Sequence, residues 1–179
     1  MSLRPFSIRS PLGRGNWTGV VHFGMQITRA TDYAVRVMVQ LAALPQGEKA
    51  QLTALGSATG VSVSFLSKVL QRLVHGGLVT SLRGTGGGFF LRPHAEKTTL
   101  LQVIEVMEGP TLLNQCLISG LSCDRKPWCG VHPVWQRAQA ALSAVLGSVS
   151  IAELAKETVA GLARQSESRG SEEDVVRLS

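Results

Sequence analysis

The order of periodic segments between residues 31 and 91 constrains the fold most, because three helical patterns lead directly into a strand-like pattern. Apolar residues recur three and four positions apart in 31–44, in 52–59 and again in 62–75, which predicts three amphipathic helices. Gly60 supplies the tight turn between the second helix and the third. Two short helices joined in this way are typical of a helix-turn-helix.

Polar residues refine where these helices begin. Thr31 or Asp32 can cap the first helix and Ser62 can cap the third, since their side-chain oxygens accept the unpaired amide hydrogens of a first turn. The apolar face predicted for the third helix consists of Phe65, Leu66, Val69, Leu70 and Leu73.

A glycine-rich hairpin follows the third helix. Residues 78–82 and 89–91 alternate enough to form two short strands, and the glycine-rich tip 83–88 joins them. The tip lacks the Lys-Ser/Thr pair of a nucleotide phosphate loop and precedes a strand, so a nucleotide site is not expected. The hairpin instead forms a wing, and the predicted fold is a mostly α-helical winged helix-turn-helix with a small β-hairpin.

The net charge of +6 is unevenly distributed along the chain. Residues 1–24 carry +3 and residues 25–97 carry +5, whereas the remainder is neutral or acidic. A basic excess in the first half favours a polyanionic partner such as nucleic acid. No apolar run reaches about 18 residues, and Gly and Pro interrupt 1–24 too often for a signal peptide. We therefore expect no membrane association and a cytoplasmic protein.

All three cysteines lie in one segment, which ends at a histidine: Cys116, Cys123, Cys129 and His132 follow the spacing Cys-x6-Cys-x5-Cys-x2-His. Glycines and prolines within it predict a loop. An odd number of thiols in a reducing compartment argues against a disulfide framework. Thiolates and an imidazole suit either an iron–sulfur cluster or tetrahedral zinc, and the spacing alone leaves both open.

The helices around this segment carry capping boxes, at Thr99 with Gln102 and at Ser150 with Glu153. Pro133 suits the start of a long helix, whose apolar stripe is Val134, Ala138, Ala141, Leu142, Val145 and Leu146. This stripe predicts a dimerisation helix, with packing on the chain's own winged helix as the alternative. A shorter helix is expected from Ser150 to about Leu162.

Residues that face DNA can be assigned from the predicted geometry. The third helix presents Ser62, Ser64, Ser67 and Lys68 to a groove, and Arg72 either reaches the DNA backbone or covers an apolar seam. In the wing, Arg83 can enter a narrow minor groove, and Gly84, Thr85 and Gly86 let the backbone approach DNA closely.

The wing motif followed by three clustered cysteines resembles the IscR/NsrR family of winged-helix regulators, over about residues 25–160. The resemblance implies a dimeric bacterial transcription factor that holds an iron–sulfur cluster and senses it. Some members lack the cysteines and bind DNA without a cluster. This chain keeps all three, so the resemblance favours an iron–sulfur cluster over zinc.

The resemblance also implies the ligands. Cys116, Cys123 and Cys129 match the cluster thiolates, and His132, followed three residues later by Trp135, matches the fourth ligand of one branch. Asp32 matches the acidic fourth ligand that the other branch takes from the partner subunit. A histidine ligand implies 2Fe–2S, which we favour, and an aspartate implies 4Fe–4S. Pro133 favours an extended conformation for His132.

These observations predict four segments: a flexible extension (1–24), a winged DNA-binding domain (25–97), a cluster loop with dimerisation helices (98–162) and a disordered tail (163–179). The predicted function is a homodimeric regulator, a repressor in preference to an activator, that binds a double-stranded operator. An iron–sulfur cluster that senses iron–sulfur status, redox state or nitric oxide is expected to control this binding. The alternative is a zinc-bound or thiol-based regulator of the same fold. No catalytic constellation is present in the sequence, so an enzyme is not expected.

Overall fold

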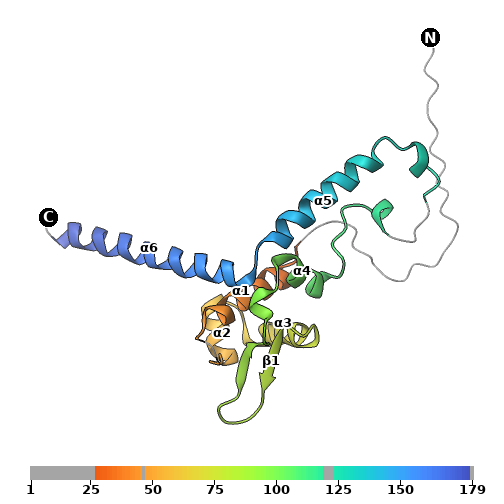
Figure 1. Ribbon diagram of the computed structural model, residues 1–179. Coiled ribbons are helices and arrows are strands. Elements are labelled where there is room, and N and C mark those ends of the chain that lie inside the picture. The colour runs from red at the N-terminus through yellow and green to blue at the C-terminus, as the bar shows by residue number, and fades with distance from the viewer. Residues whose placement is uncertain (1–26, 46, 119–122, 178–179) are drawn as a thin grey trace.

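The helix-turn-helix and the wing are both present in the computed structural model, which describes residues 27–45, 47–118 and 123–177 (Figure 1). The predicted extension 1–24 lies outside the described residues. The helices are α1 (Arg29–Ala43), α2 (Leu52–Thr59), α3 (Val63–His75), α4 (Leu100–Glu108), α5 (His132–Ser148) and α6 (Ile151–Arg177). The strands are β1 (Val79–Leu82) and β2 (Gly88–Leu91), and the short 3-10 turns are η1 (Ala95–Lys97), η2 (Gln115–Leu117) and η3 (Lys126–Trp128).

The hydrophobic core lies where α1, α3, α4 and the start of α6 meet. Its largest fully buried side chains are Met38, Leu66, Leu70, Leu73, Met107 and Ile151. The core therefore joins the helix-turn-helix to the helices on both sides of the cysteine segment. Among the described residues no helix is both long enough and apolar enough to span a bilayer.

Two expectations for the helix-turn-helix were wrong. Helix α1 begins before Thr31, at Arg29, and Thr28 is its N-cap, since Thr28 Oγ1 accepts a 3.3 Å hydrogen bond from the Thr31 amide. Phe65 does not belong to the buried face of α3, because 37% of it is exposed. Its ring instead meets Tyr33 of α1 edge-on, with the centroids 5.9 Å apart.

The wing is attached to the body at its base. Strands β1 and β2 pair antiparallel, with Val79 opposite Leu91 and Leu82 opposite Gly88. Ala50, which precedes α2, extends this pairing through two 2.9 Å backbone hydrogen bonds with Phe89. At the tip, a Cβ on Gly87 would lie 2.3 Å from the Leu82 carbonyl oxygen, so the backbone packs too closely there for a side chain. The wing is thus a shaped hairpin with a supported base.

Helix α6 is longer than expected. The Ser150–Glu153 capping box that starts it is present, since Glu153 Oε2 accepts from the Ser150 amide at 2.8 Å. The helix does not end near Leu162 but continues to Arg177, through residues that were expected to be disordered. Eight of the fifteen residues from 163 to 177 are good helix formers (Ala, Arg, Gln or Glu), and no proline interrupts this stretch.

Candidate functional site

The outer face of α3 is polar and exposed, as a surface that reads DNA requires. Ser64, Lys68, Gln71 and His75 lie along it, opposite the buried residues Leu66 and Leu70. Ser62 stands at the N-cap, but its hydroxyl makes no capping bond and lies 3.5 Å from the Ser64 hydroxyl. Ser67 is only half-buried. The structure therefore leaves the predicted serines and Lys68 available to a ligand on this face.

The wing extends from the body on the side away from α5 and α6 (Figure 1). All four predicted tip residues, Arg83, Gly84, Thr85 and Gly86, are exposed. The side-chain amide of Gln51 donates a hydrogen bond to the Gly87 carbonyl, which ties the tip to the start of α2. The tip is thus held relative to the helix-turn-helix while its outer residues stay free to meet a partner.

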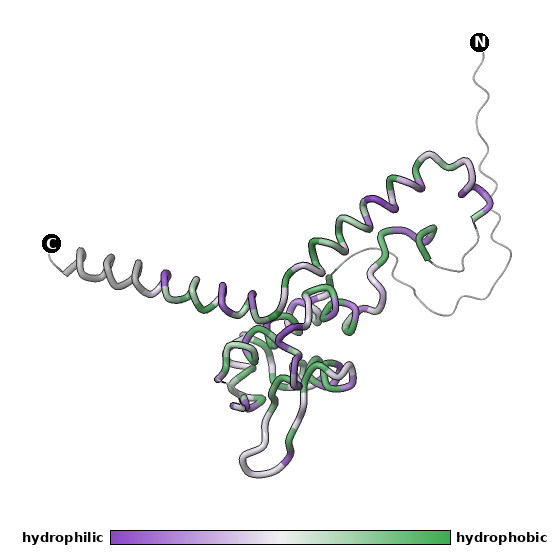
Figure 2. Tube along the Cα trace, in the orientation of Figure 1, coloured by the Kyte–Doolittle hydropathy of each residue, from purple (hydrophilic) through white to green (hydrophobic). Residues whose placement is uncertain are grey.

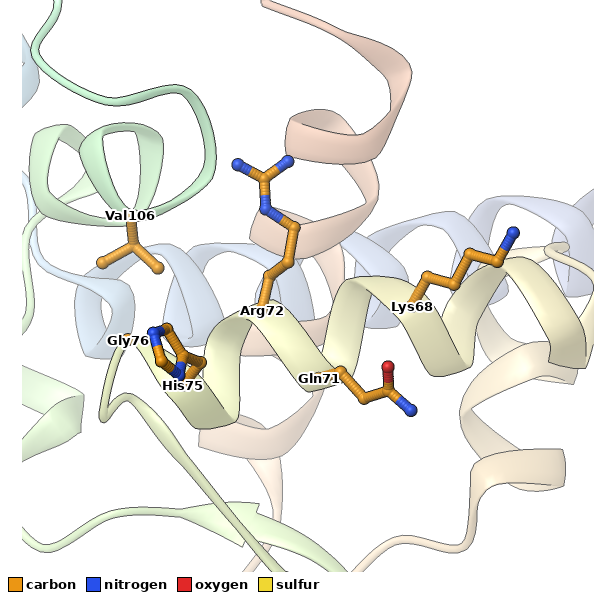
Figure 3. Close-up of a pocket in the computed structure, with 6 residues that line it drawn as sticks. All are labelled: Lys68, Gln71, Arg72, His75, Gly76 and Val106. Carbon is orange, nitrogen blue, oxygen red and sulfur yellow. The ribbon is translucent and has the colours of Figure 1, made fainter.

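A basic groove of about 560 Å³ runs between α3 and α4 (Figure 3). It is lined by Lys68, Gln71, Arg72, His75, Gly76 and Val106, with no acidic side chain among them. Arg72 does not extend freely from α3, because its guanidinium donates a hydrogen bond to the Met107 carbonyl near the end of α4. This contact ties α3 to α4.

Glu108, which carries no functional signal in the sequence pattern, joins the end of α4 to the start of α1. Its Oε1 accepts hydrogen bonds from the Thr28 hydroxyl at 2.6 Å, from the Thr28 amide at 3.3 Å and from the Thr31 hydroxyl. Burial raises the pKa of Glu108, but these hydrogen bonds and the nearby Arg72 charge outweigh it and lower the pKa below its ordinary value. The carboxylate is therefore stabilised in its charged form.

The three cysteines are free and half-buried. Cys116 lies in η2, Cys129 follows η3, and residues 119–122 next to Cys123 lie outside the described residues. Within the described ranges no group of three or more His, Cys, Asp or Glu side chains converges to hold a metal ion. The predicted ligand set is thus not assembled.

His132 is the exception, since its ring is already withdrawn from solvent. The residue is 7% exposed, and neither ring nitrogen has a hydrogen-bond partner among the described residues. Its backbone is helical and not extended as Pro133 led us to expect: it opens α5, and its amide donates to the Cys129 carbonyl at 3.2 Å. Burying an imidazole without partners costs free energy, which a ligand on one nitrogen would offset. By residue type, three thiols and this imidazole within one segment fit the donors that an iron–sulfur cluster or zinc accepts.

Asp32, the alternative fourth ligand, is already engaged. Its carboxylate forms a 2.9 Å ion pair with Arg36 one turn further along α1, and about half of each side chain is exposed. The Arg36 guanidinium also lies over the Tyr33 ring, 5.6 Å from its centroid. Among the described residues, Asp32 therefore has a cationic partner, whereas the ring nitrogens of His132 have no hydrogen-bond partner.

Helix α5 extends from the body with hydrophobic residues along its length (Figure 2). The predicted stripe divides into two faces. Leu142 and Leu146 are half-buried on the side toward the body, where Gln139 hydrogen-bonds to the Thr111 carbonyl and the Leu113 amide, each at 2.9 Å. The other face leaves Val131, Val134, Ala141 and Val145 exposed, Val145 at 66%. One face thus packs on its own chain and the other lacks a cover among the described residues.

Known proteins resemble this chain over most of its length. The sequence model of the Rrf2 family, described as an iron-dependent transcriptional regulator, matches residues 27–157. Protein aau3 of Rhizobium meliloti is 36% identical over 134 residues, covering 74% of this chain and 86% of that protein. The HTH-type transcriptional regulator IscR of Xenorhabdus nematophila is 30% identical over 132 residues, covering 74% and 80%. The structure of CymR, the global cysteine regulator of B. subtilis, has the same fold, with a TM-score of 0.61 at 24% identity over 74% of this chain and 98% of that one.

Proposed function

Because the chain belongs to the Rrf2 family of transcriptional regulators, we propose that an iron–sulfur cluster in its cysteine segment controls operator binding by a homodimer. The family makes the chain a transcriptional regulator that binds DNA, and relatives such as IscR are named as HTH-type transcriptional regulators. We place its action in the cytoplasm and favour repression over activation.

The observation that carries the cluster proposal is the donor set of residues 116–132. Three free thiols and a buried imidazole without a partner among the described residues lie within this one segment. Cys116, Cys123 and Cys129 would supply thiolates, and the cluster would supply a redox-sensitive core. We favour His132 over Asp32 as the fourth ligand, since Asp32 is paired with Arg36, and hence 2Fe–2S over 4Fe–4S.

DNA reading falls to α3 and the wing. The exposed hydroxyls of Ser62 and Ser64, the half-buried Ser67 and the exposed ammonium of Lys68 suit phosphate and base-edge contacts from α3. The tip residues Arg83 to Gly86 suit the adjacent minor groove. A homodimer would present two such surfaces to a pseudo-palindromic operator.

The same donor set also suits zinc or a thiol-based redox sensor, which is the second candidate. Anaerobic purification separates the two. A brown protein with charge-transfer absorption, whose operator affinity changes when the cluster is removed, supports the iron–sulfur proposal. A colourless protein with stoichiometric zinc, or one whose operator affinity responds only to thiol oxidation, contradicts it.

A specific contact between the wing and the operator can be tested by removing it. Substituting Arg83→Ala should weaken operator binding by about 1–3 kcal/mol, because the guanidinium would leave the groove without changing the hairpin. Titration of the operator against salt measures this. Arg92→Ala removes the same charge just beyond β2, at the hairpin's base, and serves as the control. Equal losses in the two variants would mean that the tip contributes only general electrostatic attraction.

A further inference from the structure

The last turn of α4, residues 105–108, contacts α3 and precedes the cysteine segment along the chain. Its Met107 and Glu108 contact α3 and α1, and the chain passes from it through Gly109 and Pro110 into the cysteine segment. We propose that Arg72 and Glu108 are positioning residues that transmit the state of the cysteine segment to α3. This inference rests on the proposed function and deepens it.

The contact with α3 is close and directional. The last carbonyls of a helix have no partner within it, so the Arg72 guanidinium satisfies one of them at Met107. One turn later, a Cβ on Gly76 would lie 2.4 Å from Cγ1 of Val106, so α3 and α4 approach as closely as a glycine allows. Figure 3 shows Arg72 and Val106 on the same side of α3, with Gln71 directed away from them. A shift of this turn of α4 therefore has to move α3 or break the contact.

The contact with α1 fixes the opposite side of the same turn. Glu108 accepts hydrogen bonds from Thr28 and Thr31 at the first turn of α1, and Thr31 is fully buried. Such bonds to a carboxylate are stronger than neutral ones. The end of α4 is thus held between α1 and α3 by two charged side chains, one of each sign.

Beyond Pro110 the chain continues into residues 111–113, which are hydrogen-bonded to α5. Thr111 and Leu113 are hydrogen-bonded to Gln139, so the residues that lead into the cysteine segment are attached to α5. The Thr111 hydroxyl is buried without a hydrogen-bond partner among the described residues. A buried hydroxyl left unpaired marks a place where a second arrangement can be lower in energy. Assembly of the ligands around a cluster would supply that second arrangement, and packed helices respond to it by discrete shifts.

A direct role in DNA binding is the competing explanation for Arg72. If Arg72 touches DNA, its removal weakens binding to the same extent with and without the cluster. If Arg72 is a positioning residue, its removal instead reduces the ratio between the two affinities, because the cluster no longer acts on α3. The ratio of operator dissociation constants with and without the cluster therefore distinguishes the two roles.

The test compares matched variants of the full chain. Arg72→Met keeps the aliphatic stem but cannot donate to the Met107 carbonyl. Glu108→Ala removes the carboxylate that accepts the hydrogen bonds of Thr28 and Thr31. Both should lower the ratio from the wild-type value, about 5–150-fold for typical coupling, to near 1 while cluster content stays at the wild-type level. Arg72→Lys and Glu108→Gln keep a donor and an acceptor and should retain most of the ratio. Glu105→Ala, an exposed residue of α4, should leave it unchanged.

Three results would overturn the inference. One is an unchanged ratio in Arg72→Met and Glu108→Ala, with both affinities lowered equally. Another is loss of the cluster from Arg72→Lys and Glu108→Gln, since the contacts of these two residues would then hold the cluster in place and not transmit its state. A wild-type ratio near 1 would instead reject the proposed cluster control itself, and the inference with it.

Discussion

Substituting Cys129→Ser should leave the purified protein without the charge-transfer absorption expected of the proposed cluster and change its operator affinity by about 5–150-fold. The serine hydroxyl is not ionised at neutral pH and is a harder donor than a thiolate, so a cluster loses one of its four attachments. Cys129 also accepts the His132 amide through its carbonyl, and this backbone bond is unaffected by the substitution. Absorption after anaerobic reconstitution and operator titration measure the two effects.

Lys126→Ala is the matched control, because Lys126 is an exposed residue of η3 in the same segment. It should retain both the absorption and the cluster-dependent affinity. Full cluster content in Cys129→Ser would remove Cys129 from the ligand set and would favour a set completed by other residues, such as Asp32.

The second large effect is expected on α5. Val145→Glu places a carboxylate on the exposed apolar face that we assign to the dimer contact, where burial of an unpaired charge is costly. The protein should become monomeric at micromolar concentration. Its affinity for a full operator should fall by about 10²–10⁴-fold, because a monomer loses the gain from binding two half-sites together. Light scattering after size exclusion reports the mass, and titration of full and half operators reports the affinity.

Gln136→Glu tests whether any new charge on α5 has this effect, since Gln136 is exposed on the opposite face of the helix. It should remain dimeric. If Val145→Glu also remains dimeric, then a surface other than this face of α5 joins the subunits, and Val159 and Leu162 of α6 become the next exposed apolar residues to test.

The helix-turn-helix and wing could be predicted from local patterns, because apolar spacing and glycine positions act within a few residues. The exact start of α1 could not, since the threonine that caps it also bonds to Glu108, which is 80 residues away in the sequence. Phe65 has the spacing of a core residue, but its ring packs edge-on against Tyr33 of α1 and 37% of the residue stays exposed. Tertiary partners, and not weak local signals, account for both errors.

The candidate site likewise has residues that the sequence identifies and residues that only the structure identifies. Cysteine and histidine identities are readable because few residue types bind soft metals, and the structure adds that His132 is buried without a partner among the described residues. Arg72 and Glu108 carry no such signature, since charged residues on helices are common. Their roles follow only from the approach of α1, α3 and α4.

The shape of the wing tip predicts how mutations should accumulate in it. Gly87 lies against backbone atoms of Leu82, Arg83 and Gly84, which cannot move aside without opening the hairpin. Thr85 is exposed, and its side chain makes no hydrogen bond to the described residues. Over evolutionary time Gly87 should therefore stay fixed even in lineages that change their operator, whereas position 85 should drift with the DNA that the wing meets. Substitutions at position 85 would then follow the divergence of binding sites, while the backbone that carries them stays constant.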